Sequence, residues 1–551
     1  MTTYPFDLGS HTRPASTTSA TAQAWFDRGL IWCYAFNHEE AIRCFEHAAA
    51  EDPGFALAHW GIAYAVGPNY NKDWDVFPEE DLRVSLRRAH DEVTTARELA
   101  AHASPVERDL IDALSARFPA ADPVDDFVPW KLAYADAMAE VHAAHPDDLD
   151  VLAIYADALM NLSAWQLWDV ASGSPAEGAR TLEIKALLDA AFQQPGAMEH
   201  PGLLHLYVHL MEMSPTPEAA MPAADVLRGL VPDAGHLLHM PTHIDVLVGD
   251  YEQVIRWNTE AIAADDRYAS YRGPLNFYSL YRAHDHHFRI YGAMFSAQLG
   301  VALEAATALE GLVTEELLRI ESMPMADWLE GFAPMRLHVL VRFGRWDDLV
   351  ATPLPRDPEL WATTTAMTHY ARGVAHAASE RVAEAEAERE LFREAVSRVP
   401  ASRYLFNNTC LDILAIAGAM LDGEVAYRRG DYDTAFADLR RAIELDDTLP
   451  YDEPWGWMQP TRHAYGALLL EQGHVEEAAA VYAADLGVDD TLGRPRQHPN
   501  NVWSLHGYHE CLGRLGRGDE AAVVKQQLDL AAARADIPIK ASCFCRLHTA
   551  A

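Results

Sequence analysis

The sequence predicts an all-α protein built from pairs of antiparallel helices. Runs in which Val, Ile and Thr alternate with polar residues are scarce, whereas Ala, Leu, Glu and Arg recur at helical spacing from residue 22 to about residue 535. Near the C-terminus, Gly430, Gly473 and Gly516 follow one another at a constant interval. A constant interval of this kind indicates stacked helical repeats, because each helix pair needs neighbours to bury its apolar face.

The first helix pair is expected in residues 22–53, "AQAWFDRGLIWCYAFNHEEAIRCFEHAAAEDP". Small residues at the eighth and twentieth positions let two antiparallel helices approach, large residues fill the space between them, and a proline stops the second helix. The residues with these roles are Trp25, Gly29, Trp32, Ala41, Phe45, Ala48 and Pro53.

The same pattern returns near the C-terminus, where a short insertion follows each helix pair. One insertion, "PYDEPWGWMQP" (residues 450–460), is too rich in proline and glycine to be helical throughout. It either packs between helices or covers a groove. The residues that carry the repeat are Gly423, Ala435, Leu439 and Ala442, then Gly466, Ala478 and Tyr482, then Ala521.

These spacings resemble the tetratricopeptide repeat (TPR) at both ends of the chain and more loosely in the middle. The chain is most similar to long bacterial TPR proteins of unassigned role, a resemblance that implies a fold but no reaction. It implies one helix-turn-helix solenoid over residues 21–535, curved around a concave groove that the first helix of each repeat lines. Residues 1–20 are expected to form an extended or disordered tail, and residues 536–551 a C-terminal tail with a Cys-x-Cys pair.

The composition narrows the classes of partner. The chain has 551 residues with 43 Lys and Arg against 82 Asp and Glu, a formal charge of −39 that repels nucleic acid and anionic membranes. The first residues lack the apolar core of a secretion signal, and no apolar stretch is long enough to span a bilayer. Six cysteines are too few for a disulfide framework, so a cytoplasmic location is expected.

Two pairs of histidines occupy matching positions in consecutive repeats. Ala220 and Val254 hold equivalent positions exactly one repeat length apart, so no insertion separates these repeats. In both repeats the fifth and ninth positions of the first helix are histidine, and residues at i and i+4 share one helix face. The resemblance places those positions on the groove, where neighbouring first helices pack about 10 Å apart. We therefore expect four imidazoles to converge there: His205, His209, His239 and His243.

A further group follows in "YRAHDHHFRIYGAMF", within histidine-bearing repeats that span about residues 197–310. If this segment begins another first helix, His284, His287 and Tyr291 face the same groove, whereas Asp285 and His286 point away. Peripheral candidates for the groove are His200, His236 and Asp157.

Clustered neutral imidazoles suit a transition metal ion such as Zn, Cu or Fe. Glu212, one turn beyond His209, is a candidate metal ligand, orienter of a ligand or general base. Pro241 lies between His239 and His243 and lacks an N–H, so it can break the helix and separate them. The alternative interpretation of all these residues is a set of satisfied core histidines.

Three functions remain open from the sequence. The first is a metal-binding TPR protein, which as a metal-dependent enzyme would act on a small molecule. HExxH, GxSxG, P-loop and GxGxxG patterns do not occur, so motifs do not separate hydrolysis from redox chemistry. The second is a non-catalytic scaffold that binds a peptide or partner protein in the groove, and the third is a histidine-based pH sensor.

The C-terminal tail holds one more candidate metal group. Cys543 and Cys545, with His548, are either ligands for a thiophilic metal such as Cu(I) or part of an ordinary tail.

Overall fold

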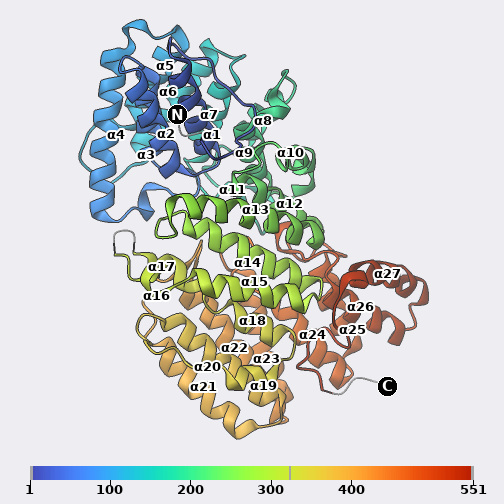
Figure 1. The fold of residues 1–551 in the computed structure, drawn as a ribbon. Coiled ribbons are helices and arrows are strands. Elements are labelled where there is room, and N and C mark those ends of the chain that lie inside the picture. The colour runs from blue at the N-terminus through green and yellow to red at the C-terminus, as the bar shows by residue number, and fades with distance from the viewer. Residues whose placement is uncertain (1–3, 322–323, 548–551) are drawn as a thin grey trace. The chain divides into compact units, whose positions relative to one another are not determined.

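The computed structural model describes residues 4–321 and 324–547, which fall into two compact units. Unit 1 comprises Met1–Ile244 with Glu260–Tyr271, and unit 2 comprises Asp245–Thr259 with Arg272–Ala551. Strands in the described ranges are limited to two antiparallel pairs, β1 (Trp168–Asp169) with β2 (Ser174–Pro175) and β3 (Tyr404–Leu405) with β4 (Asn408–Thr409). The prediction of an all-α protein is confirmed (Figure 1).

In unit 1, successive helices pack against one another from α1 to α10, and the first helices of the pairs also contact each other. Helix α1 contacts both α3 and α9, and α9 contacts α7, so the inner side of α9 is packed within the unit. The helices are α1 (Ala20–Tyr34), α2 (His38–Glu51), α3 (Ala56–Val66), α4 (Glu79–Leu99), α5 (Pro105–Arg117), α6 (Val128–Ala144), α7 (Leu149–Met160), α8 (Thr181–Ala191), α9 (Pro201–Met211), α10 (Met221–Leu227) and α11 (Gly235–His239), with short 3₁₀ turns η1 (Trp74–Val76), η2 (Ala100–His102), η3 (Ala197–Glu199) and η4 (Pro217–Ala220).

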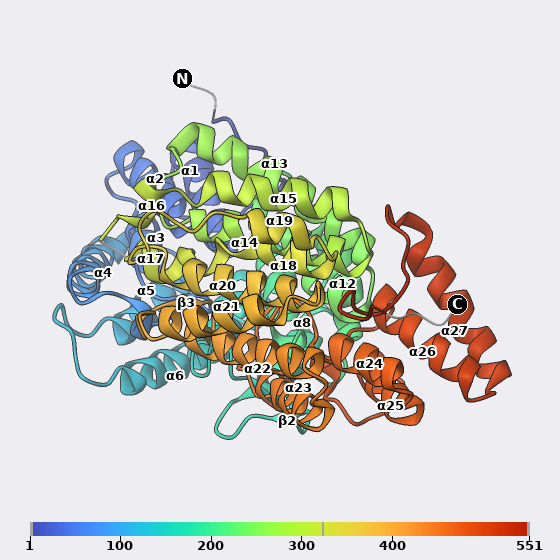
Figure 2. The same cartoon turned by 90° about the horizontal axis from the view of Figure 1, so that it is seen from below.

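In unit 2, α20 to α23 lie side by side as two antiparallel pairs, and α24 to α27 continue the row (Figures 1 and 2). Helices α12 (Pro241–Val248) and α13 (Tyr251–Arg272) carry residues of both units. The remaining helices are α14 (Ser279–Phe295), α15 (Leu299–Leu312), α16 (Glu315–Leu318), α17 (Met325–Leu329), α18 (Met335–Arg342), α19 (Trp346–Ala351), α20 (Ala362–Ala378), α21 (Val382–Val396), α22 (Cys410–Arg428), α23 (Tyr432–Asp447), α24 (Thr461–Gln472), α25 (Val475–Leu486), α26 (Val502–Arg514) and α27 (Gly518–Ala531), with η5 (Glu330–Phe332), η6 (Arg494–Arg496) and η7 (Ala532–Arg534).

One close contact recurs in the repeats at both ends of the chain. In each of three repeats, the glycine at the eighth position of the repeat, on its first helix, lies directly against a large side chain of the second helix. A Cβ atom on the glycine would meet that side chain at less than 3 Å, so only glycine allows the two helices this approach. The pairs, with the distance to the hypothetical Cβ, are Gly29 and Phe45 (2.6 Å), Gly423 and Leu439 (2.8 Å), and Gly466 and Tyr482 (2.5 Å).

The evenly spaced loop glycines end the first helix of each C-terminal repeat. Gly430, Gly473 and Gly516 have φ values of 80°, 85° and 72° and follow the first helices α22, α24 and α26. In this left-handed region a Cβ is unfavourable, so glycine ends each helix and turns the chain into its partner.

The insertion at residues 450–460 contains no helix or strand, as predicted. Its aromatic residues are buried within unit 2: Trp457 packs against His338 (5.0 Å between ring centroids) and Tyr370 (5.5 Å), and Trp455 against Tyr291 (5.5 Å). Of the two alternatives for this loop, packing between helices is the one that the structure favours.

Residues 4–18 form an extended segment that is packed on unit 1. The guanidinium of Arg13 is 6% exposed and donates to Asp148 (2.6 and 2.9 Å) and to Asp150 (3.1 Å). Helix α1 begins after this segment at Ala20, with Ser19 as its N-cap. In the part of the chain that the structure describes, no helix is both long and apolar enough to cross a bilayer.

Candidate functional site

The first histidine pair lies on α9, whose start is set by local chemistry. Pro201 occupies the first helical position, and the ring Nδ1 of His200 accepts from the backbone N–H of Leu203 (3.2 Å) as an N-cap. His205 and His209 then share one face, with ring centroids 4.8 Å apart. Both are buried, with 1% and 0% exposure, and therefore do not line an exposed surface.

Pro241 does break the second helix, since α11 ends at His239 and α12 begins at Pro241. The break does not separate the second histidine pair, because Met240 keeps right-handed helical angles (φ −50°, ψ −40°). Nε2 of His239 and Nε2 of His243 are 2.7 Å apart. The two rings therefore meet through these nitrogens, with an angle of 83° between their planes.

Glu212, which follows α9 directly, joins the two pairs. Its Oε1 accepts from Nδ1 of His209 (2.9 Å), and its Oε2 accepts from Nδ1 of His243 (2.6 Å). An ionised carboxylate only accepts, so both Nδ1 atoms carry the ring hydrogen and, in the neutral rings, both Nε2 atoms carry the lone pair. The side chain of Glu212 is fully buried, so these two contacts are made in a low-dielectric interior.

The tautomer of His205 is fixed in the same way. Its Nδ1 donates to the backbone carbonyl of Tyr34 (2.6 Å), which leaves the lone pair on Nε2. Within residues 4–321 and 324–547, Nε2 of His205 and Nε2 of His209 have no hydrogen-bond partner. Buried nitrogens of this kind are rarely left without a partner in folded proteins.

His236, expected only at the periphery, belongs with the first pair. One ligand nitrogen from each of His205, His209 and His236 lies within 4.8 Å of the other two. Nitrogens that share a metal at about 2.0–2.2 Å lie up to about 4 Å apart, so this spacing needs only small side-chain movements. We call His205, His209, His236, His239 and His243, with Glu212, the histidine centre.

The electrostatics favour neutral imidazoles. Burial lowers the pKa of His205, His209 and His236 well below the usual range, and the neighbouring histidines lower it further. Neutral imidazole is the form that binds a metal ion, so no proton has to be removed from these three rings at neutral pH.

Aromatic side chains from three separate loops surround the centre. Phe36 lies 4.4 Å from the ring of His205, Tyr70 lies 4.9 Å from that of His209, and Trp165 lies 5.7 Å from it. Phe36 and Trp165 have φ values of 53° and 58°, a strained region for residues other than glycine. These residues lie far apart in the sequence without a shared spacing, so no sequence pattern pointed to them.

Asp157, a peripheral candidate, lies on α7 outside the histidine centre. Its Oδ2 accepts from the hydroxyl of Tyr64 (2.8 Å) and its Oδ1 from the amide of Asn161 (2.9 Å). Burial raises the pKa of this carboxyl. Both oxygens are thus satisfied by protein groups.

A second polar group in unit 1 contains His200, a peripheral candidate, together with residues that the sequence did not single out. Asp150 accepts from His11 and from His200, each at 3.1 Å, and from Arg13. Burial alone raises the pKa of Asp150, but these hydrogen bonds and the charge of Arg13 hold it well below the usual range. The guanidinium already supplies the positive charge here, so the group anchors the N-terminal segment and is a poor cation site.

The third histidine group lies on α14, in unit 2. Nε2 of His287 is 2.8 Å from the sulfur of Met458, and burial lowers the pKa of His287 to about 3. The ring of His284 packs against Phe406 (4.6 Å), and Tyr291 stacks on Phe295 (4.1 Å). Burial also raises the pKa of Tyr291 well above the usual range. The two residues expected to point away, Asp285 and His286, are buried as well (1% and 6% exposed).

Cys543 and Cys545 are joined by a disulfide in unit 2, with their Cα atoms 5.2 Å apart. Their sulfurs are therefore bonded to each other in this structure. His548, the third residue of this candidate metal group, lies outside the described residues.

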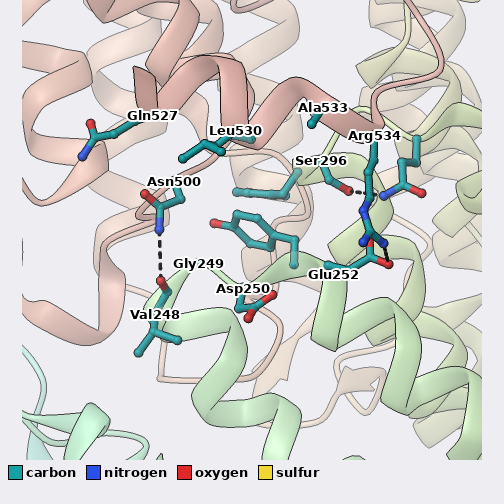
Figure 3. A pocket seen from close by; sticks show the side chains of 14 residues that line it. Val248, Gly249, Asp250, Glu252, Ser296, Asn500, Gln527, Leu530, Ala533 and Arg534 are labelled. Atoms are coloured by element: carbon teal, nitrogen blue, oxygen red, sulfur yellow. Dashed lines mark hydrogen bonds and ion pairs between the residues drawn. The ribbon is translucent and has the colours of Figure 1, made fainter. Parts of the chain in front are cut away.

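A cavity of about 460 Å³ lies in unit 2 beside α27 (Figure 3). An ion pair between Arg534 and Glu252 and a hydrogen bond from Asn500 to the carbonyl of Val248 (3.3 Å) cross its walls, and Leu530 on its rim is 80% exposed. None of the residues predicted to bind a metal lines this cavity.

The comparisons with known proteins concern the fold. The family profile described as "Tetratricopeptide repeat" matches residues 22–55, and no curated protein matches the chain in sequence. Among solved structures, yeast Tom70 is 11% identical over 92% of this chain and 96% of its own (TM-score 0.28), and Naa15/Naa10 bound to HypK-THB is 12% identical over 93% and 74% (TM-score 0.19). At such identities and TM-scores neither likeness bears on function. The match identifies one tetratricopeptide repeat at residues 22–55, and the glycine contact of that helix pair recurs in two helix pairs near the C-terminus.

Proposed function

We propose that this TPR protein binds one transition metal ion at the histidine centre of unit 1. The observation that carries the proposal is the set of oxygen atoms that lie opposite the Nδ1 atoms. Nδ1 of His205, His209 and His243 each donates to an oxygen acceptor, and the buried Nε2 atoms of His205 and His209 have no hydrogen-bond partner among the described residues. Metal-binding histidines characteristically donate their other ring N–H to a carbonyl or carboxylate, because this fixes the tautomer and raises the basicity of the ligand.

The donor set favours a first-row ion of borderline softness. Imidazole nitrogens suit Zn, Cu and Fe, whereas Ca and Mg prefer oxygen ligands. His236 is the further imidazole beside the first pair, with a ligand nitrogen within 4.8 Å of those of His205 and His209, and Nε2 of His239 lies 2.7 Å from that of His243. Metal analysis distinguishes among Zn, Cu and Fe.

For Glu212 the contacts favour a positioning role over that of a general base. Both carboxylate oxygens already accept a ring N–H, and the side chain has no exposed surface. A general base needs an oxygen within reach of a substrate proton. When bound, the ion would supply Lewis-acid or redox chemistry in an aromatic-walled site.

The test is metal analysis of untagged protein purified without an immobilised-metal column. We expect about one equivalent of a transition ion in the wild-type chain and its loss in a His205→Ala, His243→Ala double variant. His102→Ala, which removes an exposed histidine of the same unit, is the matched control and should retain the metal. Thermal melting of the metal-free proteins checks that the variants fold. A wild-type chain that is metal-free as purified and gains no thermal stability from added Zn, Cu or Fe would overturn the proposal.

A second candidate function, the binding of a peptide or partner protein, is favoured by the TPR match at residues 22–55. The histidine centre is a poor surface for that purpose because its side chains are buried. A partner would therefore use other residues, and the histidine variants should leave its binding unchanged. Retained binding of an identified partner by the double variant, measured by titration calorimetry, would separate the two functions.

A further inference from the structure

The C-terminal residues of unit 2 end in a buried, non-helical segment. Residues 541–546, which we call the C-terminal strap, contain no helix or strand. Ala541, Ser542, Cys545 and Arg546 are nevertheless only 2–6% exposed. Lys540, immediately before the strap, is exposed. The strap is thus a short non-helical segment, bent by a turn in which the N–H of Arg546 donates to the carbonyl of Cys543 (3.2 Å), and it is held against the helices of the unit.

Two arginines hold the backbone of the strap. Arg342, the last residue of α18, donates to the carbonyl of Ser542, and Arg428, the last residue of α22, donates to the carbonyl of Cys545. Arg342 is 3% exposed and also lies over the ring of Trp503 (4.1 Å). A guanidinium in such a site needs acceptors, and the strap provides one for each of the two arginines.

Side chains of the strap add two specific contacts. The hydroxyl of Ser542 donates to the carbonyl of His463 on α24 (3.0 Å) and is in contact with the hydroxyl of Tyr482. Arg546 makes a two-pronged ion pair with Glu510 on α26, at 2.7 and 2.9 Å. Paired N–H···O bonds of this type combine charge with a fixed geometry and are among the stronger side-chain contacts.

The strap runs along the first helices of successive repeats. Apart from Tyr482 on α25, its hydrogen-bond partners lie on α18, α22, α24 and α26. Its two cysteines, with Tyr370 of α20, help to enclose a cavity of about 30 Å³. These are the helices whose shared face an extended ligand would contact in a stack of helix pairs. The strap contacts them as such a ligand would, through backbone carbonyls and one charged side chain.

We infer that the strap is an intramolecular ligand of unit 2, exchangeable with a peptide of a partner protein that makes the same contacts. Such a peptide would present carbonyls to Arg342 and Arg428 and a cation to Glu510. Because the strap is tethered, its effective concentration at the face is in the millimolar range, and a competing peptide has to overcome this advantage. The inference involves unit 2 only, so its test does not depend on metal binding in unit 1.

The experiment uses the full chain and a defined probe, a fluorescent peptide of residues 536–551 with both cysteines replaced by serine. Arg546→Glu places two carboxylates together and should release the strap while leaving the helices intact. We expect this variant to bind the probe at least about tenfold more tightly than the wild-type chain does, by fluorescence anisotropy. Lys540→Glu, the same charge reversal at the neighbouring exposed residue, is the control and should bind the probe as weakly as wild type.

A charge swap tests the contact itself. Glu510→Arg should bind a probe that carries Arg546→Glu more tightly than the unmodified probe. In the Glu510→Arg, Arg546→Glu double variant the strap should close again, so its backbone amides should regain slow hydrogen exchange. Unchanged hydrogen exchange of the strap amides in Arg546→Glu would overturn the inference, and so would a variant that releases the strap but does not bind the probe. Faster hydrogen exchange throughout α22 to α26 would also overturn it, because the strap would then be part of the core.

Discussion

Replacing Glu212 by glutamine changes one oxygen acceptor into an NH₂ donor without a large change in shape. In the wild-type chain the carboxylate of Glu212 accepts the Nδ1–H of both His209 and His243, at 2.9 and 2.6 Å. The amide can accept from only one of them, so the other ring must exchange tautomers and place its hydrogen on Nε2. That ring then has no lone pair on the nitrogen proposed to bind the metal.

The expected magnitude follows from the loss of one oriented ligand. Removing the group that orients a metal-binding histidine typically weakens metal affinity by about 10–100-fold, which corresponds to about 1.4–2.7 kcal/mol. The assay is a competition titration of untagged, metal-free protein against a chromophoric chelator, with Zn²⁺ as the first ion. Glu218→Gln, the same change at an exposed residue on the turn that follows, is the matched control.

The reasoning is refuted if Glu212→Gln binds the ion as tightly as the wild-type and Glu218→Gln chains. In that case the two hydrogen bonds of Glu212 only hold the histidines in a folded core. If the folded Glu212→Gln variant loses more than about 100-fold in metal affinity, Glu212 binds the ion directly, which is one of the roles that the sequence left open.

Two further predictions concern unit 2. Burial lowers the pKa of His463 to about 4, and Arg342 donates to its Nδ1 (2.9 Å), so the folded chain keeps this ring neutral. The unfolded chain takes up a proton near pH 6.5, and the folded state should therefore lose about 3 kcal/mol as the pH falls from 6.5 to 4. His463→Gln should remove this loss of folding stability. The free energy of unfolding by urea is measured for both chains at pH 7 and pH 4.5. If the variant shows the same pH dependence as the wild-type chain, the neutral ring of His463 is not its cause. On α26, Gly507→Ala forces a Cβ into the ring of Tyr482 and should cost about 1–3 kcal/mol, whereas Gly513→Ala meets open space and should stabilise by about 0.5–1 kcal/mol. Melting temperatures that move in the same direction for both variants would show that contact with Tyr482 is not what requires glycine.

Most of the repeat architecture could be predicted because its signals are local. Gly29 and Phe45 belong to one helix pair, and the same contact recurs at Gly423 and Gly466, so a pattern no longer than one repeat contains the information. The loop glycines and the non-helical insertion at residues 450–460 were predictable for the same reason. The division of the chain into two compact units has no such local signal and emerged only from the tertiary structure.

The sequence by itself determined the helix pairs and the i, i+4 histidines, because both depend on the helical period. It could not decide which ring nitrogen of each histidine carries the hydrogen, because that depends on the oxygen atoms opposite. For His205 that oxygen belongs to Tyr34, 171 residues earlier, and for His243 it belongs to Glu212, 31 residues earlier. The partners of the strap are equally remote, with Arg342 200 residues from Ser542. Hydrogen-bond partners that the chain brings together over such separations are fixed by packing, and only the tertiary structure decided them.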